Sequence, residues 1–106
     1  MKCRFHDYEK YKVLKAPVME FHCSESDLDI DFDVVNTDSE LIIHAPEIVE
    51  REIVDICSKD VRIVEKSLDI LQRTIDKTIG MSSNWPLAKP KMVVHLGGMS
   101  LDKIEE

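Results

Sequence analysis

The sequence lacks any long hydrophobic run. No apolar stretch approaches the roughly 20 residues that a membrane-spanning helix needs. The first residues, MKCRFHDYEKYK, contain no apolar core of the kind that a signal peptide carries. We therefore expect a protein that neither spans a membrane nor carries a secretion signal.

Cysteine is scarce and forms no motif. Cys3, Cys23 and Cys57 cannot all pair within one chain, and none of them belongs to a CxxC sequence. This usage is typical of free thiols in a reducing cytoplasm, where we expect the protein to be. Because free cysteine is among the most buried residue types, each of the three is expected to be a small buried side chain.

Basic residues are outnumbered by acidic ones. Lys and Arg total 14 against 21 Asp and Glu, which gives a formal net charge of -7. A nucleic-acid surface or an anionic membrane surface needs clustered Lys and Arg, so neither is an expected partner. With 106 residues, 43% of them hydrophobic, the chain is predicted to be a single domain over 1–106 with a modest core, and residues 1–15 show no clear period.

What the sequence does have is a repeated strand ending. VMEFH, LIIH and KMVVH are short apolar runs that each end in histidine, at His22, His44 and His95. Runs of this kind predict strands buried on one or both faces. The strands are predicted over 18–23, 41–44 and 91–95.

The clearest helix is predicted over 61–79. Its apolar residues step by three and four, which makes one stripe of the kind that faces a core. Asp60 is a suitable N-cap, Gly80 stands where a C-terminal glycine is common, and Asp69 and Arg73 are spaced as a favourable ion pair. The stripe consists of Val61, Val64, Leu68, Leu71, Ile75 and Ile79.

The order strand, helix, strand predicts a β-α-β unit with parallel strands and a right-handed crossover. The fold class is therefore α/β, with about three parallel strands and one long crossover helix. Residues 27–35, DLDIDFDVV, are expected to be an extended or loop segment whose aspartates are solvated, since the EF-hand pattern is absent. Residues 47–60 are expected to connect the second strand to the helix, with a helical turn.

Parallel strands end at the same edge of a sheet, which is where α/β proteins place their ligands. We therefore expect His22, His44 and His95 to lie together at this edge. Alternation puts Glu20 on the face of His22, so imidazoles and a carboxylate would converge there, as in a Zn²⁺, Mn²⁺ or Fe²⁺ site. The opposite faces are wholly apolar and suit packing against helices. The alternative is that each histidine is a hydrogen-bonded structural residue, while His6 is expected at the surface.

Two neighbouring segments mark the same edge. The connection of about 16 residues after His44 is long for a compact domain, so it is expected to form a lid or a substrate wall. Gly97-Gly98 would let the backbone approach a phosphate or form a tight turn.

The order of four motifs over residues 39–100 resembles the xylose-isomerase-like TIM-barrel superfamily. IIHAPE is followed by the turn ICSKD, then by KSL in the helix, then by the strand end HLGG. Members of that superfamily commonly show His-Ala-Pro at a strand end, a Leu-Ala-Ser-x-Asp turn, Lys-Ser-Leu in the next helix and His-Pro-Gly after the next strand. This chain has Leu96 in place of that proline and Glu47 in place of an aromatic residue.

The resemblance implies a metal-dependent isomerase or epimerase of sugars or sugar phosphates, and the segment EFHCSESDLDID is similar to modules of nonulosonate sugar pathways. It implies a divalent metal (Zn²⁺, Mn²⁺ or Mg²⁺) bound by His44 and His95. Glu20 and His22 are the expected catalytic or substrate-contacting residues.

Two other functions stay open. An endonuclease IV-type nuclease belongs to the same superfamily, although the acidic charge and Glu47 disfavour it. A complete barrel has eight strands and this chain supplies about three, so it is predicted to be a partial TIM-barrel-like unit. Such a unit is either part of an enzyme or an interaction module without activity. Its open sheet edges predict self-association or a partner that completes the barrel.

Overall fold

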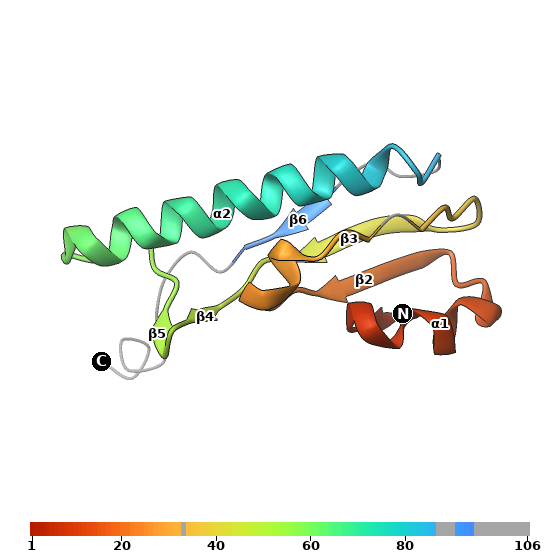
Figure 1. Ribbon diagram of the computed structural model, residues 1–106, viewed down its shortest axis with the longest axis horizontal. Coiled ribbons are helices and arrows are strands. Elements are labelled where there is room, and N and C mark those ends of the chain that lie inside the picture. The colour runs from red at the N-terminus through yellow and green to blue at the C-terminus, as the bar shows by residue number, and fades with distance from the viewer. Residues whose placement is uncertain (33, 87–90, 95–106) are drawn as a thin grey trace, which may run out of the picture.

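The computed structural model describes residues 1–32, 34–86 and 91–94. Four parallel strands form one sheet, in the order β1-β2-β3-β6, and a 22-residue helix, α2, packs along it over β3 and β6 (Figure 1). The main elements are β1 (Lys2–Cys3), β2 (Val18–His22), β3 (Glu40–His44), α2 (Val61–Ser82) and β6 (Lys91–Val93).

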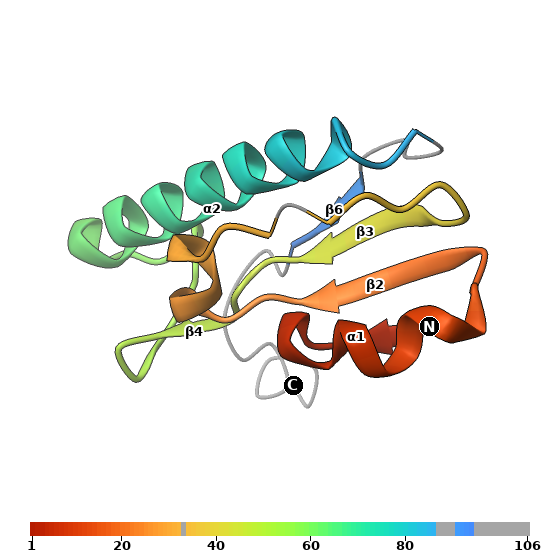
Figure 2. The ribbon, with the colours of Figure 1, turned by 45° about the vertical axis from the view of Figure 1, so that its right-hand side comes forward.

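Short elements complete the described part of the chain. Three of them follow one another after β1 and lie against the β2 end of the sheet (Figure 2). A two-stranded antiparallel hairpin, β4 and β5, precedes α2. Their bounds are η1 (Phe5–Asp7), α1 (Tyr8–Tyr11), η2 (Lys12–Leu14), η3 (Glu25–Asp29), β4 (Ile48–Val49) and β5 (Glu52–Ile53).

The predicted α/β class, with parallel strands joined by a long crossover helix, is confirmed. The sheet has a fourth strand, β1, which pairs in parallel with β2. This strand could not be predicted from the sequence, because two residues are too few to show alternation. The last strand, β6, ends at Val93 and does not include Val94, while the predicted strand end at His95 lies outside the described residues.

The two faces of the sheet differ as the alternation predicts. Met19, Phe21, Leu41 and Ile43 point to one face and are at most 1% exposed. Aromatic rings from β2, η1, α1 and the segment after α2 pack on this face, with Phe5 stacked on Phe21 at a centroid distance of 4.6 Å. The other face carries the half-buried residues of β2 and β3, including both histidines.

The start of α2 is as predicted and its end is not. The Asp60 side chain accepts a hydrogen bond from the Arg62 backbone N–H at 2.9 Å, which confirms the N-cap. Gly80 was expected just past the C-terminus, but the helix continues through it to Ser82. The last turn of α2 stays helical because Met81, and Trp85 just after the helix, are buried in the main core.

The rotation of α2 contradicts the expectation that its apolar stripe faces the core. Val61, Leu68, Ile75 and Ile79 are 67, 54, 38 and 60% exposed. The side chains that α2 buries are instead Ser67, Ile70, Thr74, Thr78 and Met81.

Small hydroxyl residues make this rotation possible. Thr74 and Thr78 each donate a hydrogen bond to the carbonyl four residues earlier, at 2.8 Å, so their polar atoms are satisfied within the helix. The Ser67 hydroxyl accepts the Asp55 backbone N–H at 2.7 Å. These short side chains let α2 lie close to the sheet and leave the wider apolar stripe on its flank.

Two loop expectations also need correction. The segment 27–35 begins inside η3, where Asp27 is buried and its carboxylate accepts hydrogen bonds from the backbone N–H and hydroxyl of Ser24, both at 2.9 Å. Asp27 is therefore a cap and not a solvated residue, whereas Asp29 is exposed. The connection 47–60 contains the β4–β5 hairpin in place of a helical turn.

The three cysteines are free thiols, and Cys3 and Cys23 are buried as expected. Cys57 is exposed, contrary to expectation, because it lies in the loop between the hairpin and α2. Within the described ranges, no helix has both the length and the hydropathy to span a bilayer.

Candidate functional site

The site is built on the carboxyl ends of β2 and β3. The two strands pair in parallel with His22 directly opposite His44. Their imidazole rings stack with centroids 4.4 Å apart and planes inclined by 9°. The sequence therefore predicted correctly that these two histidines meet at one edge of the sheet.

Glu20 lies one step back on the same face. Its Oε2 is 3.9 Å from Nε2 of His44, and the two side chains are 23% and 19% exposed. This distance is too long for a hydrogen bond, but it gives an electrostatic attraction whenever the imidazole is protonated. The carboxylate and the imidazole are thus close enough to act on one small ligand.

A cleft of about 220 Å³ opens in front of the histidines. Backbone from the end of β2 and from the start of the hairpin forms its walls. The residues that line it are Arg4, His22, Cys23, Ser24, His44, Ala45, Pro46, Glu47 and Ile48. Arg4 and Glu47 bring a cation and a carboxylate to the cleft, so it suits a polar ligand.

Sequence reasoning missed Arg4 and Ser24 as part of this site. Arg4 follows the two-residue strand β1, and nothing in the first 15 residues marks the position as a strand end. Ser24 is held by the capping box that it forms with Asp27, a pattern that the sequence S-E-S-D contains.

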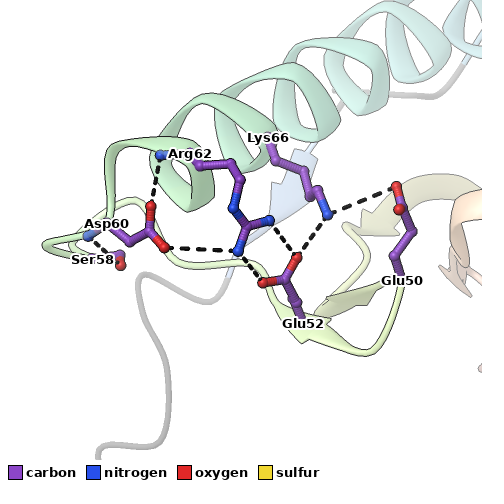
Figure 3. Close-up of polar contacts among 6 residues, drawn as sticks. All are labelled: Glu50, Glu52, Ser58, Asp60, Arg62 and Lys66. Atoms are coloured by element: carbon purple, nitrogen blue, oxygen red, sulfur yellow. Dashed lines mark hydrogen bonds and ion pairs between the residues drawn. The ribbon is translucent and has the colours of Figure 1, made fainter.

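The β4–β5 hairpin follows His44 and forms one wall of the cleft through Glu47 and Ile48, and ion pairs fix it to α2. That this segment acts as a lid or substrate wall stays a prediction. Glu52 of β5 accepts two hydrogen bonds from the Arg62 guanidinium, at 2.8 and 2.6 Å, and one from Lys66 at 2.8 Å (Figure 3). These cations hold the pKa of Glu52 at about 2, with the Arg62 hydrogen bonds as the main cause. Glu50 adds a weaker contact to Lys66 at 3.7 Å.

The hairpin also has a small core of its own. Val49 and Val54 are buried against Ile70 of α2. This contact and the ion pairs position Ile48 and Glu47 at the cleft. The first half of α2 therefore holds the hairpin wall of the cleft in position.

His95 is the expected fourth member of the site, and it lies outside the described residues. The register of β6 places Val93 beside His44, so this position in the row belongs to valine. The predicted gathering of His95 with His22 and His44 stays a prediction.

A divalent metal fits part of this arrangement. Two atoms that bind one Zn²⁺ or Mn²⁺ at about 2.0–2.2 Å lie within about 4.3 Å of each other, and the 3.9 Å between Glu20 Oε2 and His44 Nε2 meets that limit. The ring of His22 is parallel to that of His44, so its nitrogens point alongside those of His44 and do not converge with them on one ion. Across the part of the chain that the structure describes, no group of three His, Cys, Asp or Glu side chains forms a metal site.

Comparison of the chain with models of protein families, with curated proteins and with solved structures gave no match.

Proposed function

We propose that this chain provides the histidine-bearing edge of a metal-dependent isomerase or epimerase that acts on a sugar or sugar phosphate. The observation that carries the proposal is the His22–His44 stack at the carboxyl ends of two parallel strands, with Glu20 3.9 Å from His44. The motif resemblance over residues 39–100 supports the same reaction class.

In this proposal His44 and His95 bind the divalent ion, Zn²⁺, Mn²⁺ or Mg²⁺. When bound, the ion polarises the carbonyl and hydroxyl oxygens of the substrate. Glu20 moves the proton between neighbouring carbons, because its carboxylate faces the same side of the sheet as His22 and His44. His22 donates a hydrogen bond to a substrate oxygen, and its stacking on His44 fixes the orientation of its ring.

Arg4 gives the cleft its selectivity for a phosphorylated sugar. Its guanidinium can hold two phosphate oxygens at once. The cleft of about 220 Å³ is small, which suits a monosaccharide and excludes a duplex nucleic acid. We place the reaction in the cytoplasm, where the free thiols Cys3 and Cys23 stay reduced.

Metal titration tests the proposal. Isothermal titration of metal-free protein with Zn²⁺ and Mn²⁺ is expected to show binding that weakens at least about tenfold in a His44→Ala, His95→Ala double variant. His6→Ala is the matched control, since His6 is exposed and does not line the cleft, and it should bind as the wild type does. Equal affinity in the double variant and the wild type would refute the metal site.

Proton exchange tests the reaction. Incubation with aldose and ketose phosphates in deuterated water should place deuterium on the carbon next to the carbonyl, and Glu20→Gln should abolish this exchange. If metal binds but no substrate exchanges, the chain is an interaction module. Salt-dependent binding to abasic duplex DNA would favour the nuclease instead.

A further inference from the structure

In the described part of the chain, the outer strands β1 and β6 each have one unpaired edge, and one face of the sheet carries no helix. Among the described residues, β1 pairs only with β2 and β6 pairs only with β3, so each has an outer edge without a neighbouring strand. Within residues 1–32, 34–86 and 91–94, no helix covers the face that carries Glu20, His22 and His44, since α2, η1 and α1 all pack on the other face. An open edge and an uncovered face are both places where a further chain can pack.

The β6 end of the sheet is apolar and acidic. On α2, Arg73 donates a hydrogen bond to Asp29 at 2.8 Å. Lys77 donates one to the carbonyl of Ile30 at 2.7 Å. These contacts place this flank of the helix on the β2 side. At 100° per residue, Leu68 and Ile75 lie on the opposite flank, toward the free edge of β6.

Carboxylates border this stripe on its outer side. Glu65, Asp69 and Asp76 lie on the outer side of the helix and are exposed, and Asp69 also lies 3.8 Å from the guanidinium of Arg73. The β6 end of the molecule therefore presents an apolar stripe with negative charge beside it.

The β1 end has the complementary chemistry. Five of the first 15 residues are Lys or Arg and two are Asp or Glu, and all five basic side chains are exposed. In the same segment Val13 and Leu14, at the end of η2, are 71% and 60% exposed. This end presents apolar side chains with positive charge beside them, on the same face of the sheet as α2.

We propose that two copies of this chain associate head to tail and close an eight-stranded parallel barrel. In each of two identical contacts, β6 and α2 of one copy meet β1 and the N-terminal helices of the other. Four strands from each copy make the eight of a complete barrel. A head-to-tail contact repeated around a twofold axis along the barrel keeps all strands parallel and leaves no free edge.

The same closure completes the site, and this part rests on the proposed function. The uncovered face becomes the interior of the barrel. Both copies then direct Glu20, His22 and His44 to the same end, so the partner copy can supply the ligands that one copy lacks.

Charge selects this occupant over two others. A pair of α2 helices packed stripe to stripe would bring Glu65 and Asp69 of both copies together, which is unfavourable for like charges. Residues 100–106 carry three carboxylates and one lysine, and this net negative charge does not complement the acidic flank of α2. The N-terminal segment of a second copy is the described surface that offers both apolar contacts and positive charge.

Sedimentation equilibrium of the intact chain, with and without EDTA, tests the assembly. We expect twice the 12.2 kDa of one chain in both conditions. Leu68→Glu should raise the dimer dissociation constant at least about tenfold, since a charge would face an apolar contact. Val35→Glu is the matched control, because Val35 is 66% exposed and lies on a loop outside both contact surfaces. Far-UV circular dichroism checks that each variant is folded.

Charge reversal distinguishes the head-to-tail contact from an α2–α2 pair. Glu65→Lys with Asp69→Lys should weaken the dimer, Lys10→Glu with Lys15→Glu should weaken it equally, and the four changes together should restore it. If the α2 reversal strengthens the dimer and the N-terminal reversal has no effect, the helices pair with each other and the proposal is wrong. A monomer at all concentrations, or open polymers of increasing mass, also overturns it. A dimer that binds no metal refutes the proposed function and leaves the assembly standing, whereas a monomer that binds metal does the reverse.

Discussion

Replacing Arg51 by glycine should stabilise the protein, because the hairpin beside the cleft turns through two residues with positive φ. Val49 pairs with Glu52, so Glu50 and Arg51 form the whole loop, with φ of 51° and 66°. This is the type I′ geometry, which favours Asn-Gly at these positions. Neither residue here is of that kind.

The magnitude follows from two opposing terms. A side chain held in the left-handed region costs about 1–2 kcal/mol. The additional conformational freedom of glycine stabilises the unfolded chain and so lowers the free energy of unfolding by about 0.4–1 kcal/mol. We therefore expect Arg51→Gly to raise the free energy of unfolding by about 0.5–1 kcal/mol, which corresponds to a rise of several degrees in Tm, about 4–8 °C per kcal/mol for a domain near this size.

Urea unfolding followed by Trp85 fluorescence measures the change, since this single tryptophan is 1% exposed in the folded state. Lys59→Gly is the control, because Lys59 is exposed in a loop and is not among the described residues with positive φ. The control should lose about 0.4–1 kcal/mol. If Arg51→Gly is as unstable as the control, the turn is not strained and our reasoning is wrong.

Ser67→Ala should lower the free energy of unfolding by about 1–3 kcal/mol, measured by urea titration, because it leaves the backbone N–H of Asp55 without an acceptor. The pKa of Glu52 is lowered from 4.5 to about 2 in the folded protein, so its contribution to stability is complete above the unfolded value and is lost as the pH falls through the folded one. The difference in urea midpoint between the wild type and Glu52→Gln should accordingly be constant above about pH 5 and shrink toward pH 2; a difference that grows in acid would contradict the ion-pair network. Iodoacetamide should modify Cys57 first by mass spectrometry, since Cys57 is exposed while burial raises the pKa of Cys23 to about 11; early labelling of Cys23 would show that the rim of the cleft opens.

Much of the candidate site could be read from the strands alone. Alternation in VMEFH and LIIH placed Glu20 and both histidines on one face, and parallel pairing put His22 opposite His44. The stacking of the two rings and the contribution of Arg4 could not be read in this way. The ring stacking and the position of Arg4 depend on which strands are neighbours, and β1, with two residues, is too short to be predicted from the sequence.

Local chemistry in the sequence determined the strand faces, the start of α2 at Asp60 and the meeting of two histidines at one edge. These follow from side-chain period and capping, which act over a few residues. Only the tertiary structure decided how α2 rotates. Hydroxyl side chains such as Thr74 satisfy their polar atoms within the helix and pack closer to the sheet than leucine or isoleucine can, so the narrow polar face is buried and the apolar stripe is left outside. Hydrophobicity alone does not determine which face of a helix is buried, because the shape of the opposing surface also contributes.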